Sequence, residues 1–302
     1  MELNTHALET LSQCPVCSSS QFKPFISCED YTVSHETFQI IQCEGCGFKF
    51  TNPRPTEESI GKYYQSTDYI SHSNVSKGLI NSIYQVVRQF TISKKIKLIK
   101  SISKEGKNIL DYGSGTGEFL YAIKKSGWNA KGAEPNSDAR NYAINNHLLE
   151  VVEPAEIRFF PKGSFDIITL WHVLEHIHKL NEIIDELKKM LAINGKIIVA
   201  VPNNKAAEQL IYGQSWAAYD VPRHLYHFNL DSIKQLFENH QMKVEKFMTM
   251  PFDAFYVSIL SEKYKESNLG FIKGFFNGTR TLIKSFFDKQ KSSSLIFIIG
   301  KV

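Results

Sequence analysis

Short apolar runs alternate with segments of helical periodicity from residue 108 onward. This alternation is typical of a parallel sheet whose strands are joined by crossover helices. The expected strands are 108–112, 129–133, 149–152, 165–170, 196–201, 243–250 and 295–299. The clearest expected helices are 118–126, 180–191 and 230–239. The pattern therefore predicts an α/β fold built on one open sheet.

The chain before residue 106 has a different pattern. Prolines at 53 and 55 break it, and apolar residues then recur at helical spacing between about 77 and 103. We expect an N-terminal unit over 1–54, a helical connector over 55–105, and the α/β domain over 106–302 with insertions near 203–229 and 251–293. The connector either packs on the core or forms a lid. In the lid interpretation the side chains that reach the site are Tyr63, Tyr64, Tyr69 or His72.

Four of the five cysteines form two C-x-x-C pairs, Cys14 with Cys17 and Cys43 with Cys46. Each pair is half of a tetrahedral thiolate site, and the 25 residues between the pairs leave room for a hairpin. A small unit without much core gains stability from such a metal. The spacing predicts a structural Zn²⁺ in an N-terminal zinc ribbon, and reduced core cysteines or a redox pair are the alternatives. The fifth cysteine, Cys28, is expected to be a buried thiol.

A glycine-rich turn follows the first strand of the α/β part, with glycines at 113, 115 and 117. Glycines let a backbone turn close beneath a ligand, and the helix that follows points free N–H groups at that ligand. A dinucleotide fingerprint needs glycine at position 118, where this chain has Glu118. That anion argues against a pyrophosphate, and Asp111 before the turn suits a ligand with an ammonium and a sulfonium group.

The stretch from Leu110 to Gly117 resembles motif I of the class I S-adenosylmethionine (SAM) methyltransferases. The resemblance implies a Rossmann-like sheet that is parallel except for an antiparallel last strand, which we expect at the sheet's edge. Glu134, which ends the second strand, is placed to accept from both ribose hydroxyls, as in any fold of this type. The expected cofactor-binding residues are Asp111, Gly113, Ser114, Gly115, Gly117, Glu134, Glu156 near the adenine, and His172 near the methionine end.

Histidines gather after two expected elements. His172 and His176 follow the fourth strand, where the segment resembles a family motif that lines the methionine end of SAM, and His176 is a candidate proton acceptor. A metal pair from these two is the weaker interpretation, because no third ligand is clustered with them. His224 and His227 lie in a loop over 212–228 that is dense in aromatic and charged residues, and both are further candidate bases.

That loop has two interpretations. Its mixture of stacking and hydrogen-bonding groups suits a substrate pocket, and its end, from Pro222 to Phe228, resembles the substrate-proximal loop of methyltransferases found with surface-polysaccharide genes. In the alternative, the aromatic residues simply cover the core.

The composition and charge of the chain limit the kinds of partner that it is expected to bind. Of 302 residues, 42% are hydrophobic and 22% are charged, and the net charge of +4 demands no polyanionic partner, so nucleic acid is not expected. Lysines 94, 95, 97 and 100 are expected on a solvated helix face. No apolar run approaches a membrane span and the first ten residues lack the features of a signal peptide, so we expect a cytoplasmic protein. Residues 271–291 combine phenylalanines with cations, which suits contact with a membrane surface or packing on the protein itself.

The sequence thus favours an enzyme that transfers a methyl group from SAM to an O, N or C acceptor, most readily on a small molecule or saccharide precursor. One alternative is an RNA or protein methyltransferase that uses the ribbon for recognition, although the first part of the ribbon is not basic. The second is a non-catalytic SAM-binding module.

Overall fold

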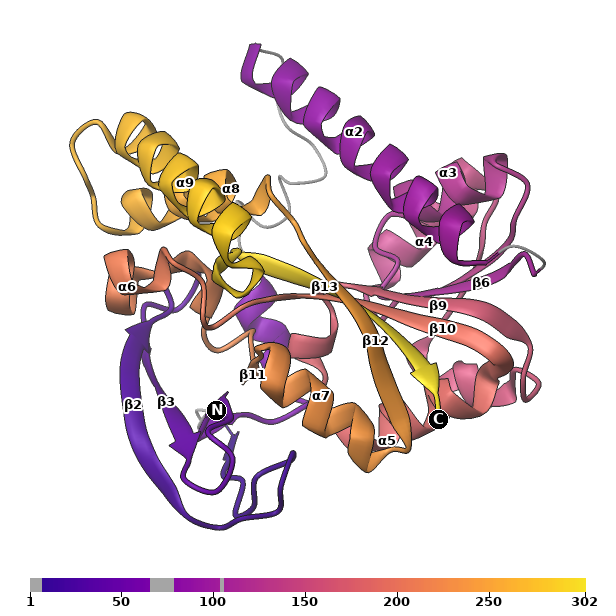
Figure 1. Ribbon diagram of the computed structural model, residues 1–302, viewed down its shortest axis with the longest axis horizontal. Helices are drawn as coiled ribbons and strands as arrows, with labels where there is room; N and C mark the ends of the chain where they lie inside the picture. The colour runs from indigo at the N-terminus through magenta and orange to yellow at the C-terminus, as the bar shows by residue number, and fades with distance from the viewer. Residues whose placement is uncertain (1–6, 66–78, 104–105) are drawn as a thin grey trace, which may run out of the picture.

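The computed structural model describes residues 7–65, 79–103 and 106–302. Tyr69 and His72, two of the residues considered for a lid, lie outside this part of the chain. Figure 1 shows a central twisted sheet with helices on both faces and a smaller sheet, formed mostly by N-terminal strands, beside it. Among the described residues, no helix has the length and apolar character needed to cross a bilayer.

The central sheet has seven strands in the order β12-β13-β10-β9-β6-β7-β8. Their bounds are β6 (Asn108–Tyr112), β7 (Asn129–Ala133), β8 (Glu150–Val152), β9 (Phe165–Trp171), β10 (Leu191–Pro202), β12 (Met242–Thr249) and β13 (Ser294–Lys301). Strands β8, β7, β6, β9 and β10 run parallel, and β13 runs antiparallel to both of its neighbours. The expected Rossmann-like fold with an antiparallel last strand is confirmed.

The expected position of that last strand at the sheet's edge is wrong. Strand β13 lies between β10 and β12, and pairs with β10 from Ser294 to Gly300. The reason is the hydrophobicity of β13, in which Leu295, Phe297 and Ile299 are fully buried. An apolar strand with a free edge would offer unpaired backbone groups to other chains. The more polar β12 takes the edge instead.

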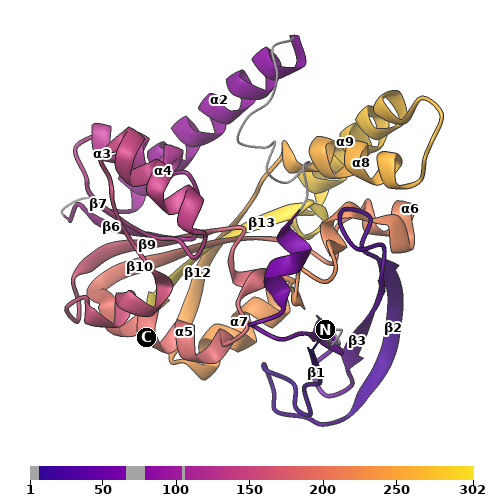
Figure 2. The ribbon, with the colours of Figure 1, turned by 180° about the vertical axis from the view of Figure 1, so that it is seen from behind.

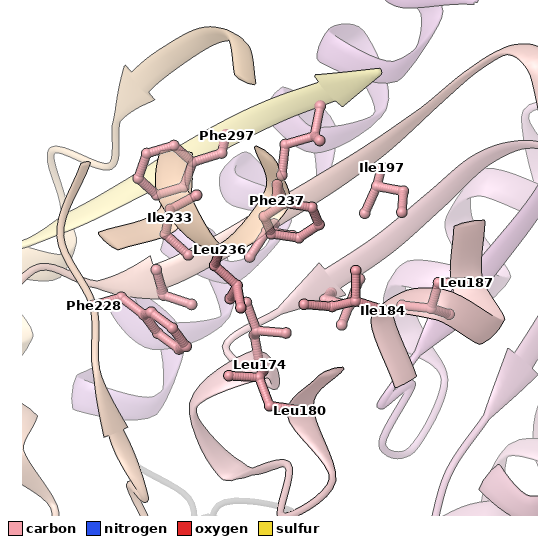
Figure 3. Close-up of a cluster of buried hydrophobic side chains, with 14 of the residues drawn as sticks. Leu174, Leu180, Ile184, Leu187, Ile197, Phe228, Ile233, Leu236, Phe237 and Phe297 are labelled. Carbon is pink, nitrogen blue, oxygen red and sulfur yellow. The ribbon is translucent and has the colours of Figure 1, made fainter. Parts of the chain in front are cut away.

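Helices cover both faces of the sheet (Figures 1 and 2). On one face, α2 (Leu79–Ile102), α3 (Glu118–Lys125) and α4 (Ser137–His147) surround a cluster that contains Ile99, Leu120 and Ile167. On the other, α5 (Leu180–Met190) and α7 (Leu230–Asn239) pack apolar side chains against β10 and β13, as Figure 3 shows. The remaining helices are η1 (Ile60–Tyr64), η2 (Pro154–Phe159), η3 (Leu174–His176), α6 (Gln209–Tyr212), η4 (Gly213–Ser215), η5 (Ala217–Tyr219), α8 (Asp253–Tyr264), α9 (Gly270–Phe287) and η6 (Lys289–Lys291).

The N-terminal part folds as a small antiparallel sheet that takes one strand from far along the chain. Its strands are β2 (Phe22–Glu29), β3 (Thr37–Cys43), β4 (Lys49–Thr51) and β11 (Tyr226–His227), in the order β11-β4-β3-β2, beside a two-stranded pair of β1 (Leu8–Glu9) and β5 (Arg54–Pro55). Phe48 and Phe50 join the same hydrophobic cluster as Leu174 and Phe228. This sheet is therefore packed onto the α/β part as well as paired with it.

A buried ion-pair network fixes this arrangement. The guanidinium of Arg223, in the loop after α6, donates to Asp30 at 2.9 Å and to Asp220 at 2.7 Å. It also donates to the hydroxyl of Thr32 and to the backbone carbonyl of Tyr63. Both Arg223 and Asp30 are almost completely excluded from solvent. Three segments that are distant in sequence thus meet on one cation.

We expect the substitution Arg223→Met to destabilise the protein by about 3–5 kcal/mol, because it leaves the carboxylate of Asp30 buried without its cation. The measurement is the midpoint of urea unfolding followed by circular dichroism. Lys179→Met is the matched control: it removes a 2.9 Å ion pair with Glu57 whose partners are both more than half exposed, so little change in the unfolding midpoint is expected. Equal costs for the two variants would contradict a special role for Arg223.

Candidate functional site

The glycine-rich turn lies at the carboxyl end of β6, and its glycines are required by geometry. Gly113, Gly115 and Gly117 all have positive φ angles. A Cβ on Gly113 would lie 2.3 Å from a methyl carbon of Val173, and a Cβ on Gly117 would lie 2.6 Å from Leu149. Nothing lies within 4 Å of a Cβ built on Gly115. Gly113 and Gly117 are thus packed against other side chains, whereas Gly115 has open space beside it, which suits a bound ligand.

Glu134 closes this turn from the end of β7. Its carboxylate accepts the N–H of Gly115 at 2.7 Å and the N–H of Asn136 at 2.9 Å. The side chain is mostly buried, and burial raises its pKa. Within the turn, the hydroxyl oxygen of Ser114 is buried without a hydrogen-bond partner among the described residues. A cofactor that brings hydroxyl and amino groups would fit these groups, so the residues present suit an adenosyl cofactor.

Glu156, expected near the adenine, lies in η2 after β8. Its carboxylate accepts the N–H of Glu153, which forms a capping box at the start of η2. Arg140 in α4 joins this segment to the site, because it donates to Glu153 and also to the backbone carbonyl of Glu134. Arg140 was not among the residues expected from sequence.

Asp111 is buried at the end of β6 and accepts a hydrogen bond of 2.6 Å from the hydroxyl of Thr169. Burial raises its pKa to about 7, against the lowering effect of Lys95 in α2. Burial likewise lowers the pKa of Lys95 to about 8, and its ammonium lies 4.3 Å from the ring centre of Trp171. Expecting Lys95 on a solvated face was wrong. The signal in the sequence is its position one helical turn before the buried Ile99.

His172 has a positive φ angle of 57° where β9 ends, which is uncommon for a residue other than glycine. Its ring nitrogens lie 3.3 Å from Asp253 and 3.5 Å from Glu175. Burial opposes a charge on this ring, but the two carboxylates outweigh it and raise the pKa of His172 to about 9. His172 is therefore a cation at neutral pH. Asp253, at the start of α8, was not expected from sequence.

His176 lies in η3, and its ring faces a different set of groups. Its Nδ1 lies 3.0 Å from the hydroxyl of Tyr64 and 3.0 Å from the carbonyl of Arg223. The ring packs edge-on against His224, with 4.7 Å between ring centres. Glu175, His176 and His224 each bring a nitrogen or oxygen atom into one group in which all lie within 4.8 Å of one another. The metal pair considered for His172 and His176 is not found among the described residues, because the group that contains His176 includes Glu175 and His224 but not His172.

His227 and most aromatic residues of the loop over 212–228 pack away from this cluster. His227 contacts Thr51 in the N-terminal sheet at 3.2 Å and packs against Tyr219. Trp216, Tyr219 and Tyr226 are all buried. Tyr63 is also buried, and its hydroxyl donates to Glu36. The loop thus contributes His224 and the carbonyl of Arg223 to the cluster, while its large rings hold the N-terminal sheet.

The sulfurs of the four paired cysteines lie close together in the N-terminal part of the chain. Cys14 and Cys46 lie 3.7 Å apart between sulfurs, and Cys17 and Cys43 lie 3.5 Å apart. All four sulfurs lie within 4.8 Å of one another, and none is in a disulfide. Backbone N–H groups of Ser18 and Gly47 donate to the carbonyls of Cys14 and Cys43 and so form the two turns. This set of soft donors fits a tetrahedral metal site. Cys28 is buried and lies outside the group.

Comparison with known proteins gives a consistent result. A family model described as a methyltransferase domain matches residues 86–246, just over half of the chain. An uncharacterized methyltransferase of Bacillus pumilus is 24% identical over 180 residues, which cover 56% of this chain and 82% of the relative. A ubiquinone biosynthesis O-methyltransferase of Glaesserella parasuis is 29% identical over 136 residues, which cover 41% of this chain and 58% of that protein. A SAM-dependent methyltransferase structure from Archaeoglobus fulgidus aligns with a TM-score of 0.48 and 18% identity, over 71% of this chain and 94% of its own.

We expect Glu134→Gln to weaken SAM binding by roughly tenfold to a hundredfold, because the site loses a charged acceptor. Isothermal titration of the protein with SAM and S-adenosylhomocysteine measures this change. The control is Glu150→Gln, on the neighbouring strand β8, where the carboxylate is exposed and paired with Lys131. Unchanged binding in Glu134→Gln, with folding intact, would show that the cofactor does not use this carboxylate.

Proposed function

We propose an acceptor class and a set of working residues for this chain, which belongs to the methyltransferase domain family and is a SAM-dependent methyltransferase. The reaction proposed is transfer of a methyl group to a nucleophilic oxygen, nitrogen or carbon of a small molecule or saccharide precursor. When bound, SAM supplies a methyl group on a sulfonium, which is transferred to a nucleophile by in-line displacement. The chain's own residues must position the two partners, exclude water and take up a proton.

One observation supports this proposal above the others: an acid–base cluster lies beside the glycine turn. Val173, which packs against Gly113, is followed directly by η3, which carries Glu175 and His176. The cluster and the turn are therefore parts of one packed unit at the carboxyl ends of β6 and β9. Ligands of open α/β sheets bind at this edge.

His176 has the properties of a proton acceptor. Its Nδ1–H donates to the carbonyl of Arg223, which leaves the lone pair of Nε2 available. Burial and the neighbouring His224 lower the pKa of His176 to about 4, so the ring is neutral at physiological pH. The carboxylate of Glu175 is fully buried, lies 3.5 Å from a ring nitrogen of His172, and belongs to the same cluster as His176. Its negative charge would stabilise the imidazolium that forms when His176 takes a proton.

His172 and Lys95 are proposed to serve the cofactor rather than the acceptor. Both are cations near the carboxyl ends of β6 and β9, and the methionine carboxylate of SAM needs such a partner. Asp253 and Glu175 hold the His172 ring in its charged form. Asp111, Gly113, Ser114, Gly115, Gly117, Glu134 and Glu156 remain the proposed contacts to the rest of the cofactor.

The N-terminal sheet presents few cations, and this supports a small-molecule acceptor rather than RNA. Of its three cations Lys23, Lys49 and Arg54, two are engaged, because Arg54 pairs with Glu9 and the ammonium of Lys49 lies 3.7 Å from the ring centre of Phe25. Such a surface does not suit the phosphates of RNA. Several relatives carry the name ubiquinone biosynthesis O-methyltransferase, which favours an oxygen atom on a small molecule. Turnover of RNA or protein alone would favour the macromolecular alternative, and SAM binding without any turnover would favour a non-catalytic module.

We expect His176→Ala to lower kcat/KM by about 10²- to 10⁴-fold while SAM affinity stays near the wild-type value, because the chain loses its base. Formation of S-adenosylhomocysteine with a panel of phenols, sugar nucleotides and amines measures this. His240→Ala is the control. His240 follows the end of α7, and its ring contacts Asp185 of α5, away from the cluster. The same loss in both variants would rule out a specific role for His176.

The wild-type profile with pH gives an independent check. A base is active above its pKa, and the pKa of His176 is about 4. Because protonation of Asp111, whose pKa is about 7, would weaken SAM binding, the profile is recorded at saturating SAM. Under that condition we expect kcat/KM for the acceptor to keep its neutral value down to about pH 5, where an ordinary histidine is already protonated. An acid limb near pH 6.5 would identify another group as the base.

The four cysteines are proposed to bind a structural Zn²⁺. We expect one zinc per chain by plasma mass spectrometry, and loss of both the zinc and the cooperative thermal unfolding of the N-terminal sheet in Cys43→Ser. Cys28→Ser is the matched control, because Cys28 is a buried thiol of the same sheet that lies outside the group. Full zinc content in Cys43→Ser, or none in the wild type, would exclude this site.

A further inference from the structure

An exposed aromatic face on α9 has no role in the proposed chemistry. Phe271, Phe286 and Phe287 have 70%, 78% and 90% of their surface exposed. Ile272, Phe275, Phe276 and Ile283 are also exposed on the same helix. Figures 1 and 2 both show α8 and α9 side by side at the periphery, outside the layers of the central sheet.

The way α9 packs explains why this face points outward. The buried residues of α9 are Gly274, Gly278, Thr281 and Ser285, which form one stripe along the helix. A Cβ on Gly274 would lie 2.6 Å from the Cα of Ile259 in α8, so the two helices approach closely through small residues. At about 100° per residue, the exposed apolar residues lie mostly on the side opposite this stripe. Most of the large rings therefore face solvent; the exception is Phe275, which packs against Phe255 of α8 with 5.4 Å between ring centres.

The charged residues of α9 are also confined to one part of its surface. Between residues 270 and 287 the helix carries Lys273, Arg280 and Lys284, all exposed, and no acidic residue. These three cations lie together about 100° to one side of the apolar face. An amphipathic helix that lies in a bilayer interface has this arrangement, with apolar groups among the acyl chains and cations among anionic headgroups. A protein partner would not require that every charge on the helix be positive.

We propose that the α9 face is a docking surface for an anionic lipid bilayer, with α9 lying in the plane of the interface. The base of the same hairpin is at the candidate active site, because Asp253 begins α8 and contacts His172. A bilayer held on α9 would lie beside the site, which suits an amphiphilic acceptor. The docking itself does not depend on the acceptor or on turnover.

The test is co-sedimentation of the full-length, zinc-loaded protein with vesicles of equimolar phosphatidylglycerol and phosphatidylcholine. We expect binding that falls with added salt, and no binding to vesicles of phosphatidylcholine alone. The double substitution Phe286→Ser, Phe287→Ser should weaken partitioning by about tenfold or more. Arg280→Gln and Lys284→Gln should each weaken it by about fivefold.

Matched controls are Ile193→Ser and Lys189→Gln, which change an exposed apolar residue near the start of β10 and a cation on α5. Neither should change binding. SAM titration of each variant checks that the fold is intact and is read separately from vesicle binding. Amide hydrogen exchange over 270–287 should slow when anionic vesicles are added. No sedimentation with these vesicles, or equal losses in the controls, would overturn the proposal. So would a concentration-dependent dimer that the phenylalanine variants abolish, because the face would then join two copies of the chain.

Discussion

The buried guanidinium of Arg223 is the constraint on which the rest of the structure depends. A charge this far from water is tolerated only with its counter-charges in place, and here they come from Asp30 in the N-terminal sheet and Asp220 in the loop. The same residue positions the candidate base from two directions. Its guanidinium holds the carbonyl of Tyr63, whose neighbour Tyr64 reaches His176, and its own carbonyl accepts from His176. The N-terminal sheet can therefore determine the geometry of the site.

The cofactor turn and the acid–base cluster are connected just as directly. Because Gly113 lacks a Cβ, Val173 can pack beneath the turn, and this contact fixes the start of η3. Two segments 60 residues apart in sequence thus form one layer at the carboxyl ends of β6 and β9. Electrostatics then separates two histidines that are four residues apart: His172 is held as a cation by carboxylates, while His176 is held neutral by burial. Their different environments suit different tasks, as paired titratable groups in enzymes commonly do.

Local patterns in the sequence were enough to predict the strands, the glycine turn and the two cysteine pairs, because each is determined by residues close together in the chain. Features that depend on distant contacts were not predictable. Lys95 was expected in solvent because its own helix face is rich in lysine, yet Asp111 on β6 gives it a buried partner. Asp253 carried no signal at all, since its importance arises only when α8 folds against β9. The edge position assigned to β13 failed for the same reason: hydrophobicity predicts a strand but does not select its neighbours.

The α8–α9 hairpin connects the exposed aromatic face of α9 with the candidate site. Helix α9 packs on α8 through its own stripe of small residues. Asn277 of α9 also donates hydrogen bonds to Tyr212 and Glu262. Helix α8 in turn begins at Asp253, whose carboxylate helps to keep His172 charged. The aromatic face and the cation beside the cofactor site are therefore connected through one hairpin, in which Gly278 of α9 packs beside Ala254 at the start of α8. If α9 docks on a lipid surface as proposed, an amphiphilic acceptor would gain from this arrangement, because the same hairpin also supplies Asp253 to the charge balance of the site.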